Sequence, residues 1–160
     1  MLSNSPMSRD FAALPRGVAA IRVKILEACA TGDIEALRIP IDWNELRPLF
    51  EIGVRRPAPM DPIEILKRRS FDRQGHDVMR ALTAVLNQPY VIEKDGVFST
   101  CVFPALAVLR PEHPTPSEWR AIWSCMLFGD LGRTTATGFP LIQTARFDLE
   151  GVWHSFLPVQ

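Results

Sequence analysis

The stretch YVIEKDGVFSTCVF (residues 90–103) constrains the fold of this chain more than any other feature. Apolar residues recur at helical spacing before it, and here the period changes to that of two strands flanking Asp95-Gly96. Because glycine and aspartate tolerate the positive φ of a type I′ turn, this pair predicts a tight β-hairpin. The chain is therefore expected to contain antiparallel strands.

Helical patterns precede this hairpin, and one more separates it from a second pair of strands. Helices are predicted over residues 16–31, 34–37, 42–48, from Asp61 onward, over 76–86 and over 116–128. Asp33, Asp42, Asp61 and Thr115 are the expected N-caps, and Pro40 and Pro48 are expected to end the two short helices. The last strands are predicted over 139–147 and 152–157.

This order predicts an α+β fold, with helices packed on one side of a curved antiparallel sheet of about four strands. Residues 1–15 are polar and irregular, and are expected to form a flexible N-terminal segment. Residues 16–160 contain no repeat, no low-complexity stretch and no sign of a boundary. They are expected to form a single domain.

Charge and cysteine usage narrow the class of protein. Lys+Arg and Asp+Glu both number 18, so the formal net charge is zero. Nucleic acid is not an expected partner, because phosphate binding relies on surplus positive charge. A membrane span is not expected either, since no apolar run approaches about 20 residues. Cys29, Cys101 and Cys125 form no close pair, which favours free thiols in a reducing compartment. We expect a cytoplasmic protein, or a periplasmic one if a leader has been removed.

Residues for catalysis or metal binding do not converge in the sequence. His76, His113 and His154 lie far apart, and none has a partner at metal-ligand spacing. Neither a metal site nor a cofactor is therefore expected. A G-x-S-x-G motif is absent, and the glycine-rich stretch GDLGRTTATG (residues 129–138) follows a helix instead of opening one. No catalytic residue is assigned, which favours a non-enzymatic role and leaves the enzyme question open.

Two pairs of neighbouring residues concern the core. Trp119 and Trp123 lie four residues apart in a predicted helix and so share one face, which predicts that both are central anchors of the core. Trp153 and His154 are adjacent in a predicted strand, so their side chains point to opposite faces. The apolar indole is the better core residue, which sends His154 outward.

Three segments resemble a family of small, uncharacterised alphaproteobacterial proteins. They are ACATGDIEALRIPIDWNELRP (28–48), PTPSEW (114–119) and LEGVWHSFL (149–157). The chain departs from the family pattern at FPALA (103–107), where an aromatic strand is reduced, and at its end, which lacks a terminal Gly-Asp. Many members look exported, which pulls against the expectation of a reducing compartment. The helix and turn that lead into GDIEAL (32–37), with the hairpin that ends in the tryptophan strand, also resemble the nuclear-transport-factor-2-like (cystatin-like) fold. The pocket of that fold serves catalysis in some members and binding in others.

Two classes of function stay open. The first is a non-enzymatic accessory or protein-interaction domain, with Trp43, Phe50 and Phe71 as an exposed interaction surface. The alternative is a small-molecule-binding protein or lyase-like enzyme with a pocket in the cupped sheet. Its ligand-binding residues would be His154, Arg146, Asp148 and Tyr90, which come from predicted strands or adjoining turns. The ligand, the partner and the oligomeric state do not follow from the sequence.

Overall fold

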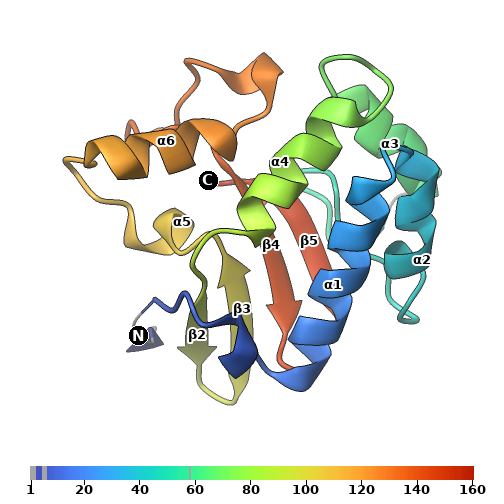
Figure 1. The fold of residues 1–160 in the computed structure, drawn as a ribbon, viewed down its shortest axis with the longest axis horizontal. Coiled ribbons are helices and arrows are strands. Elements are labelled where there is room, and N and C mark those ends of the chain that lie inside the picture. The colour runs from blue at the N-terminus through green and yellow to red at the C-terminus, as the bar shows by residue number, and fades with distance from the viewer. Residues whose placement is uncertain (1–2, 5–6, 58) are drawn as a thin grey trace.

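The structure, a computed structural model, describes residues 3–4, 7–57 and 59–160. It has the predicted α+β architecture, in which helices cover an open antiparallel sheet (Figure 1). The strands are β1 (Ser3–Asn4), β2 (Val91–Asp95), β3 (Phe98–Phe103), β4 (Gln143–Asp148) and β5 (Trp153–Pro158), each paired with the next. The helices are α1 (Arg16–Ala30), α2 (Arg38–Ile41), α3 (Pro62–Arg69), α4 (His76–Leu86), α5 (Leu106–Leu109) and α6 (Pro116–Ser124). The short 3-10 turns are η1 (Phe11–Ala13), η2 (Ile34–Leu37) and η3 (Phe128–Asp130).

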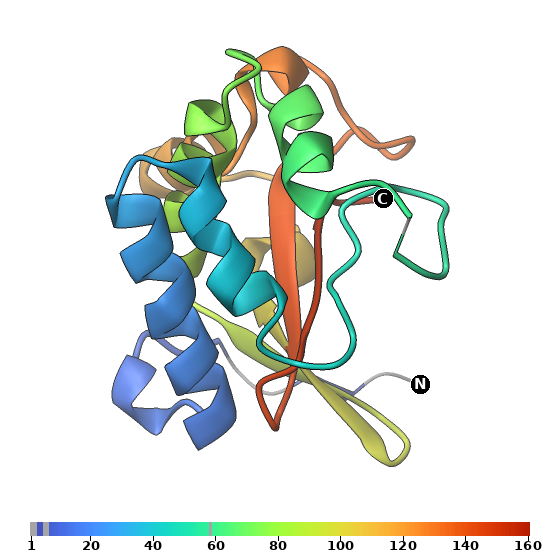
Figure 2. The same ribbon diagram turned by 90° about the vertical axis from the view of Figure 1, so that its right-hand side faces the viewer.

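The main core lies between the sheet and the helices α1 and α4, which stand together on one side of β4 and β5 (Figure 2). Both helices bury apolar residues at helical spacing, as the sequence predicts. The sheet contributes Cys101, Phe147 and Trp153, all essentially inaccessible. On the opposite face Val91 and Val102 form a small second cluster with Ala105, against which Val108 of the short helix α5 packs.

The β2–β3 hairpin confirms the predicted strands but moves the turn by one residue. Asp95 pairs with Phe98, so the two loop residues are Gly96 and Val97. Gly96 has a φ of +61°, whereas Val97 is not among the residues with positive φ. One positive φ at the first loop position is the pattern of a type II′ turn, not of the expected type I′ turn.

The segment at 42–48 is not the short helix that the sequence predicts. Asp42 is the C-cap of α2 and not the predicted N-cap, and its carboxylate accepts a hydrogen bond from the side chain of Arg47 at 2.8 Å. Leu49 instead pairs alongside β5, donating to His154 O at 2.8 Å and accepting from Phe156 N at 3.1 Å. These long-range bonds satisfy the backbone better than one isolated helical turn would, and they cover the edge of β5.

Pro40 does not end the short helix before it, because it lies inside α2. A proline is tolerated in the first turn of a helix, where the backbone N–H has no intrahelical partner in any case. The turn η2 and α2 therefore run on without a break, with Asp33 capping η2 through Glu35 N at 3.0 Å.

The described part of residues 1–15 lies against the sheet. Ser8 and Tyr90 exchange two backbone hydrogen bonds at 2.9 and 3.0 Å, and the Tyr90 hydroxyl donates to Asp10 O at 2.9 Å. The main hydrophobic core is one cluster of buried residues, drawn from positions between Leu14 and Val159 in the sequence. The N-terminal segment thus covers the sheet where the chain enters β2.

Two glycines let α1 touch the β4–β5 turn backbone to backbone. A Cβ added to Gly17 would lie 1.9 Å from Glu150 O, and one added to Gly151 would lie 2.3 Å from Gly17 O. Gly151 also has a φ of +96°, which favours glycine. This contact sets the position of the strand that starts two residues later at Trp153.

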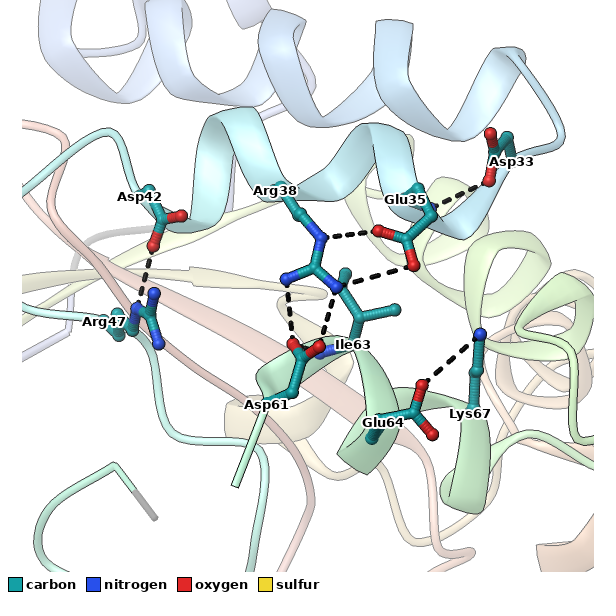
Figure 3. A network of polar contacts seen from close by, with 9 residues as sticks. All are labelled: Asp33, Glu35, Arg38, Asp42, Arg47, Asp61, Ile63, Glu64 and Lys67. Atoms are coloured by element: carbon teal, nitrogen blue, oxygen red, sulfur yellow. Dashed lines mark hydrogen bonds and ion pairs between the residues drawn. The ribbon is translucent and has the colours of Figure 1, made fainter. Parts of the chain in front are cut away.

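A polar network joins η2, α2 and α3 (Figure 3). Arg38 contacts Asp61 through two hydrogen bonds of 2.7 and 2.9 Å, and it also pairs with Glu35. Asp61 in turn caps α3 through Ile63 N at 3.0 Å, as the sequence predicts. The hydrogen bond from Arg38, followed by that from Ile63 N, lowers the pKa of Asp61. Each carboxylate in this network already has a structural partner, so the network holds helices together.

Candidate functional site

The structure brings three of the four predicted ligand-binding residues onto one face of the sheet. Arg146 and Asp148 alternate with buried Phe147 in β4 and therefore point away from α1 and α4. In β5, Trp153 pairs with Phe147 and Ser155 pairs with Arg146, which leaves His154 as the extra residue of a β-bulge. Trp153 is 1% exposed whereas His154 is exposed, so the predicted facing of this pair is confirmed.

Arg146 and Asp148 each have a structural partner. Arg146 pairs with Glu93 at 2.8 Å across the sheet. Asp148 accepts backbone hydrogen bonds from Glu150 and Val152 at 2.9 and 3.0 Å, which shape the turn. Its other oxygen lies 3.6 Å from His154 Nε2, a distance too long for a hydrogen bond. The histidine is therefore not oriented as a catalytic base would be, and ligand binding here stays a prediction.

Two predicted site residues belong to the core. Tyr90 is 4% exposed, with its hydroxyl occupied by Asp10 O and its ring 5.5 Å from that of Phe103. Phe50 is 3% exposed and lies edge-on to Trp153 at 5.3 Å. The prediction that Phe50 is exposed is wrong, because the pairing of Leu49 with β5 draws the next side chain inward.

The other two predicted interaction residues are on the surface. Trp43 is 54% exposed, with Lys24 Nζ 3.9 Å above its ring. Phe71 is 71% exposed and meets Phe128 edge-on at 6.3 Å. Their exposure agrees with the expected surface, and their part in an interaction stays a prediction.

Helix α6 carries an exposed aromatic face that sequence reasoning assigned to the core. Trp123 is 59% exposed, so the prediction that it anchors the core is wrong; Trp119 is only partly buried. The two indoles lie 5.9 Å apart. Together with Pro116 and Arg120 they line a hollow of about 470 Å³. We call these four residues the tryptophan groove.

The position of α6 follows from its local sequence. Thr115 accepts from Glu118 N at 3.1 Å and Glu118 accepts from Thr115 N at 2.9 Å, which forms the predicted capping box. Ile122 is the one fully buried residue of the helix. Successive residues are rotated by about 100°, so Trp123 points well away from the line along which α6 meets the core.

A larger hollow of about 630 Å³ lies on the other side of α6, which we call the α6 cleft. Its walls come from the N-terminal segment, the turns around α5, and α6 itself: Met7, Arg9, Gln88, Pro89, Pro104, Ala105, Leu106, Thr115, Ser117, Glu118, Arg120, Ala121 and Ser124. Arg120 belongs to both hollows. The helix therefore separates two concave surfaces that share one exposed guanidinium.

The α6 cleft unites residues that are far apart in the sequence, and for that reason sequence reasoning missed it. Arg9 and Arg120 both line it because Ser8 pairs with Tyr90, which brings the N-terminal segment to this side of the molecule. A helical projection of residues 116–124 does show Arg120 between the tryptophans and the polar face. That projection is the one signal for the site within the sequence.

The cysteines offer no reactive thiol. Cys29, Cys101 and Cys125 are free and buried. Desolvation raises the pKa of Cys101 and of Cys125 to about 12 and that of Cys29 to about 11, so the thiolate form is rare at neutral pH. Within the described residues, no three His, Cys, Asp or Glu side chains gather to hold a metal ion. No helix in this part of the chain is both long and apolar enough to cross a membrane.

No protein-family model, curated protein or solved structure matches the chain. The resemblance to the alphaproteobacterial family, and with it the cystatin-like fold, stays a prediction. The surfaces of the molecule are therefore the basis for inferring its function.

Proposed function

We propose that this protein is a protein-interaction module that binds a segment of another protein across α6. The observation that carries this proposal is the exposed tryptophan groove, in which Trp123 presents 59% of its surface to solvent. An indole is a costly group to leave in water, and contiguous exposed apolar surface is typical of interaction sites. Tryptophan and arginine are also the residue types most enriched among interface hot spots.

The charges around α6 favour an acidic partner. Arg9 and Arg120 are exposed on the walls of the α6 cleft. Glu118, the acid beside them, has one oxygen occupied by Thr115 N in the capping box. A segment with an apolar side chain next to an acidic one would place the first in the tryptophan groove and the second at Arg120.

An array of short synthetic peptides tests this proposal. One set combines a leucine or phenylalanine with a neighbouring aspartate or glutamate, and a matched set carries lysine in place of the acid. Fluorescence polarisation should show binding of the acidic set alone. Trp123→Ala should weaken that binding by about tenfold, equivalent to about 1.4 kcal/mol, and Arg120→Glu should shift the preference toward the lysine peptides.

Trp43→Ala is the matched control, because Trp43 is similarly exposed but lies far from α6 in the sequence and lines neither hollow. Its binding should equal that of the wild type. The proposal is overturned if no acidic peptide binds, or if Trp123→Ala binds as the wild type does. A loss in Trp43→Ala alone would move the interaction to the surface that the sequence first suggested.

A further inference from the structure

The guanidinium of Arg69, the last residue of α3, is held by neutral groups. One terminal nitrogen donates to Phe156 O at 2.6 Å, the other donates to Gln143 Oε1, and the Cζ atom lies 5.2 Å from the Phe156 ring centroid. Among the described residues, no Asp or Glu oxygen comes within 4.0 Å of it. By contrast, Arg80 has Asp77 at 2.9 Å and then uses two backbone carbonyls.

This cluster has more hydrogen-bond donors than acceptors. An arginine has five N–H groups, and two of those of Arg69 have acceptors within the described residues. Gln143 directs its Oε1 toward Arg69, which leaves its buried Nε2 without a partner in the same part of the chain. Burial lowers the pKa of Arg69 to about 10, although the charge of Asp130 acts in the opposite direction. A desolvated cation short of acceptors is unfavourable unless an anion joins it.

A cavity of about 380 Å³ opens beside Arg69. Five apolar residues form most of its wall: Phe50, Ile52, Leu127, Leu141 and Pro158. Arg133 and Asp130 also line it and pair with each other at 3.0 Å, and Glu51 completes the wall. The cavity thus combines a largely apolar wall with the guanidinium of Arg69, some of whose donors are unused. Its size is within the range of small-molecule sites.

We infer that this cavity binds a small monocarboxylate with an apolar body, whose two oxygens accept from Arg69. A planar guanidinium matches a carboxylate in bidentate geometry. The two acids on the wall balance the two arginines, so the site favours one negative charge over the several charges of a phosphate ester. The inference goes beyond the proposed function, because none of these residues belongs to α6 or its hollows.

Isothermal titration calorimetry with benzoate, 3-phenylpropionate and hexanoate tests the site, with 3-phenylpropanamide as the uncharged control. At least one acid should bind the wild type saturably, and more than about tenfold tighter than the amide. Arg69→Lys keeps the positive charge but loses the two-pronged guanidinium, so it should weaken the binding of that acid by about tenfold. Arg120→Glu, which alters only the α6 surface, should bind it as the wild type does, so the two proposals can fail separately.

Amide chemical-shift mapping on the wild type keeps the test decisive even if Arg69→Lys does not fold. The bound acid should shift the resonances of Ile52, Arg69 and Leu141 most strongly. The inference is overturned if none of the three acids binds below about 10 mM, if the amide binds equally well, or if the largest shifts lie outside this cavity.

Discussion

The last strand and helix α6 each present a tryptophan in an apolar stretch, yet the two indoles have opposite environments. Trp153 in β5 is 1% exposed, and Trp123 in α6 is 59% exposed. A strand in a covered sheet turns every second side chain toward a whole layer of helices. A surface helix meets the core along one narrow line, here that of Ile122. Apolar character therefore does not by itself decide burial; the width of the contact does.

The surroundings of the two indoles show the same difference. The Trp153 ring contacts Phe50 at 5.3 Å and Phe147 at 6.4 Å, and its Nε1 donates to Ser155 O at 3.0 Å. The ring of Trp123 has Trp119 as its aromatic neighbour. The last strand thus contributes to stability, whereas α6 offers surface for binding. Four predictions can break or sharpen this division.

The largest effect is expected at Trp153. Trp153→Ala should lower the free energy of unfolding by ~3–5 kcal/mol, because it removes a buried indole and leaves a cavity. A single domain has only ~5–15 kcal/mol in total, so the variant should be largely unfolded or close to it. Urea denaturation followed by circular dichroism measures the change. A smaller loss than that of Trp123→Ala would contradict the division between the two regions.

The contact of α1 with the β4–β5 turn should be the next most sensitive. Gly17→Ala places a methyl group against the backbone of Glu150, and such overpacking typically costs ~1–3 kcal/mol. Gly129→Ala is the matched control on the α6 side, because a Cβ there meets nothing within 4 Å and its φ is not positive. Thermal unfolding should separate the two variants, and equal melting temperatures would show that the close approach does not exist in solution.

The capping box of α6 should have a moderate effect. Thr115→Ala removes the hydroxyl that accepts from Glu118 N, and loss of an N-cap typically costs ~1 kcal/mol. Ser117→Ala, in the same turn but not part of the box, should change the free energy of unfolding much less. If the two variants were equally stable in urea, the start of α6 would depend on packing and not on its cap.

The smallest effects are expected at two exposed residues, Trp123 in α6 and His154 in β5. Trp123→Ala should cost no more than about 1 kcal/mol and His154→Ala no more than about 0.5 kcal/mol, as for other surface positions. Urea denaturation of both variants at neutral pH provides the measurement. A loss of several kcal/mol in Trp123→Ala would place this indole in the core after all, and would remove the basis of the proposed interaction surface.

Local features of the fold could be predicted because they depend on neighbours in the sequence. The Thr115-Pro116-x-Glu118 and Asp61-Pro62-x-Glu64 starts, the β2–β3 strands and the alternation of Trp153 with His154 all follow from spacing and backbone preference. The segment 42–48 has the same kind of local signal and nevertheless is not a helix. The local preference of this segment for a helical turn stabilises the chain less than the hydrogen bonds between Leu49 and β5, a strand more than a hundred residues later.

The sequence by itself thus determined the α+β class, the start of α6 and the outward position of His154. Only the tertiary structure decided which apolar and charged residues come together: Phe50 against Trp153, Arg9 and Arg120 on the walls of one cleft, and Arg69 beside Gln143 and the cavity. The physical reason is that burial and electrostatic environment are properties of non-local packing. The same side chain can be covered by a helix, by a strand or by water. Which of these covers it depends on segments far away in the sequence, and it is settled only when the fold brings them together.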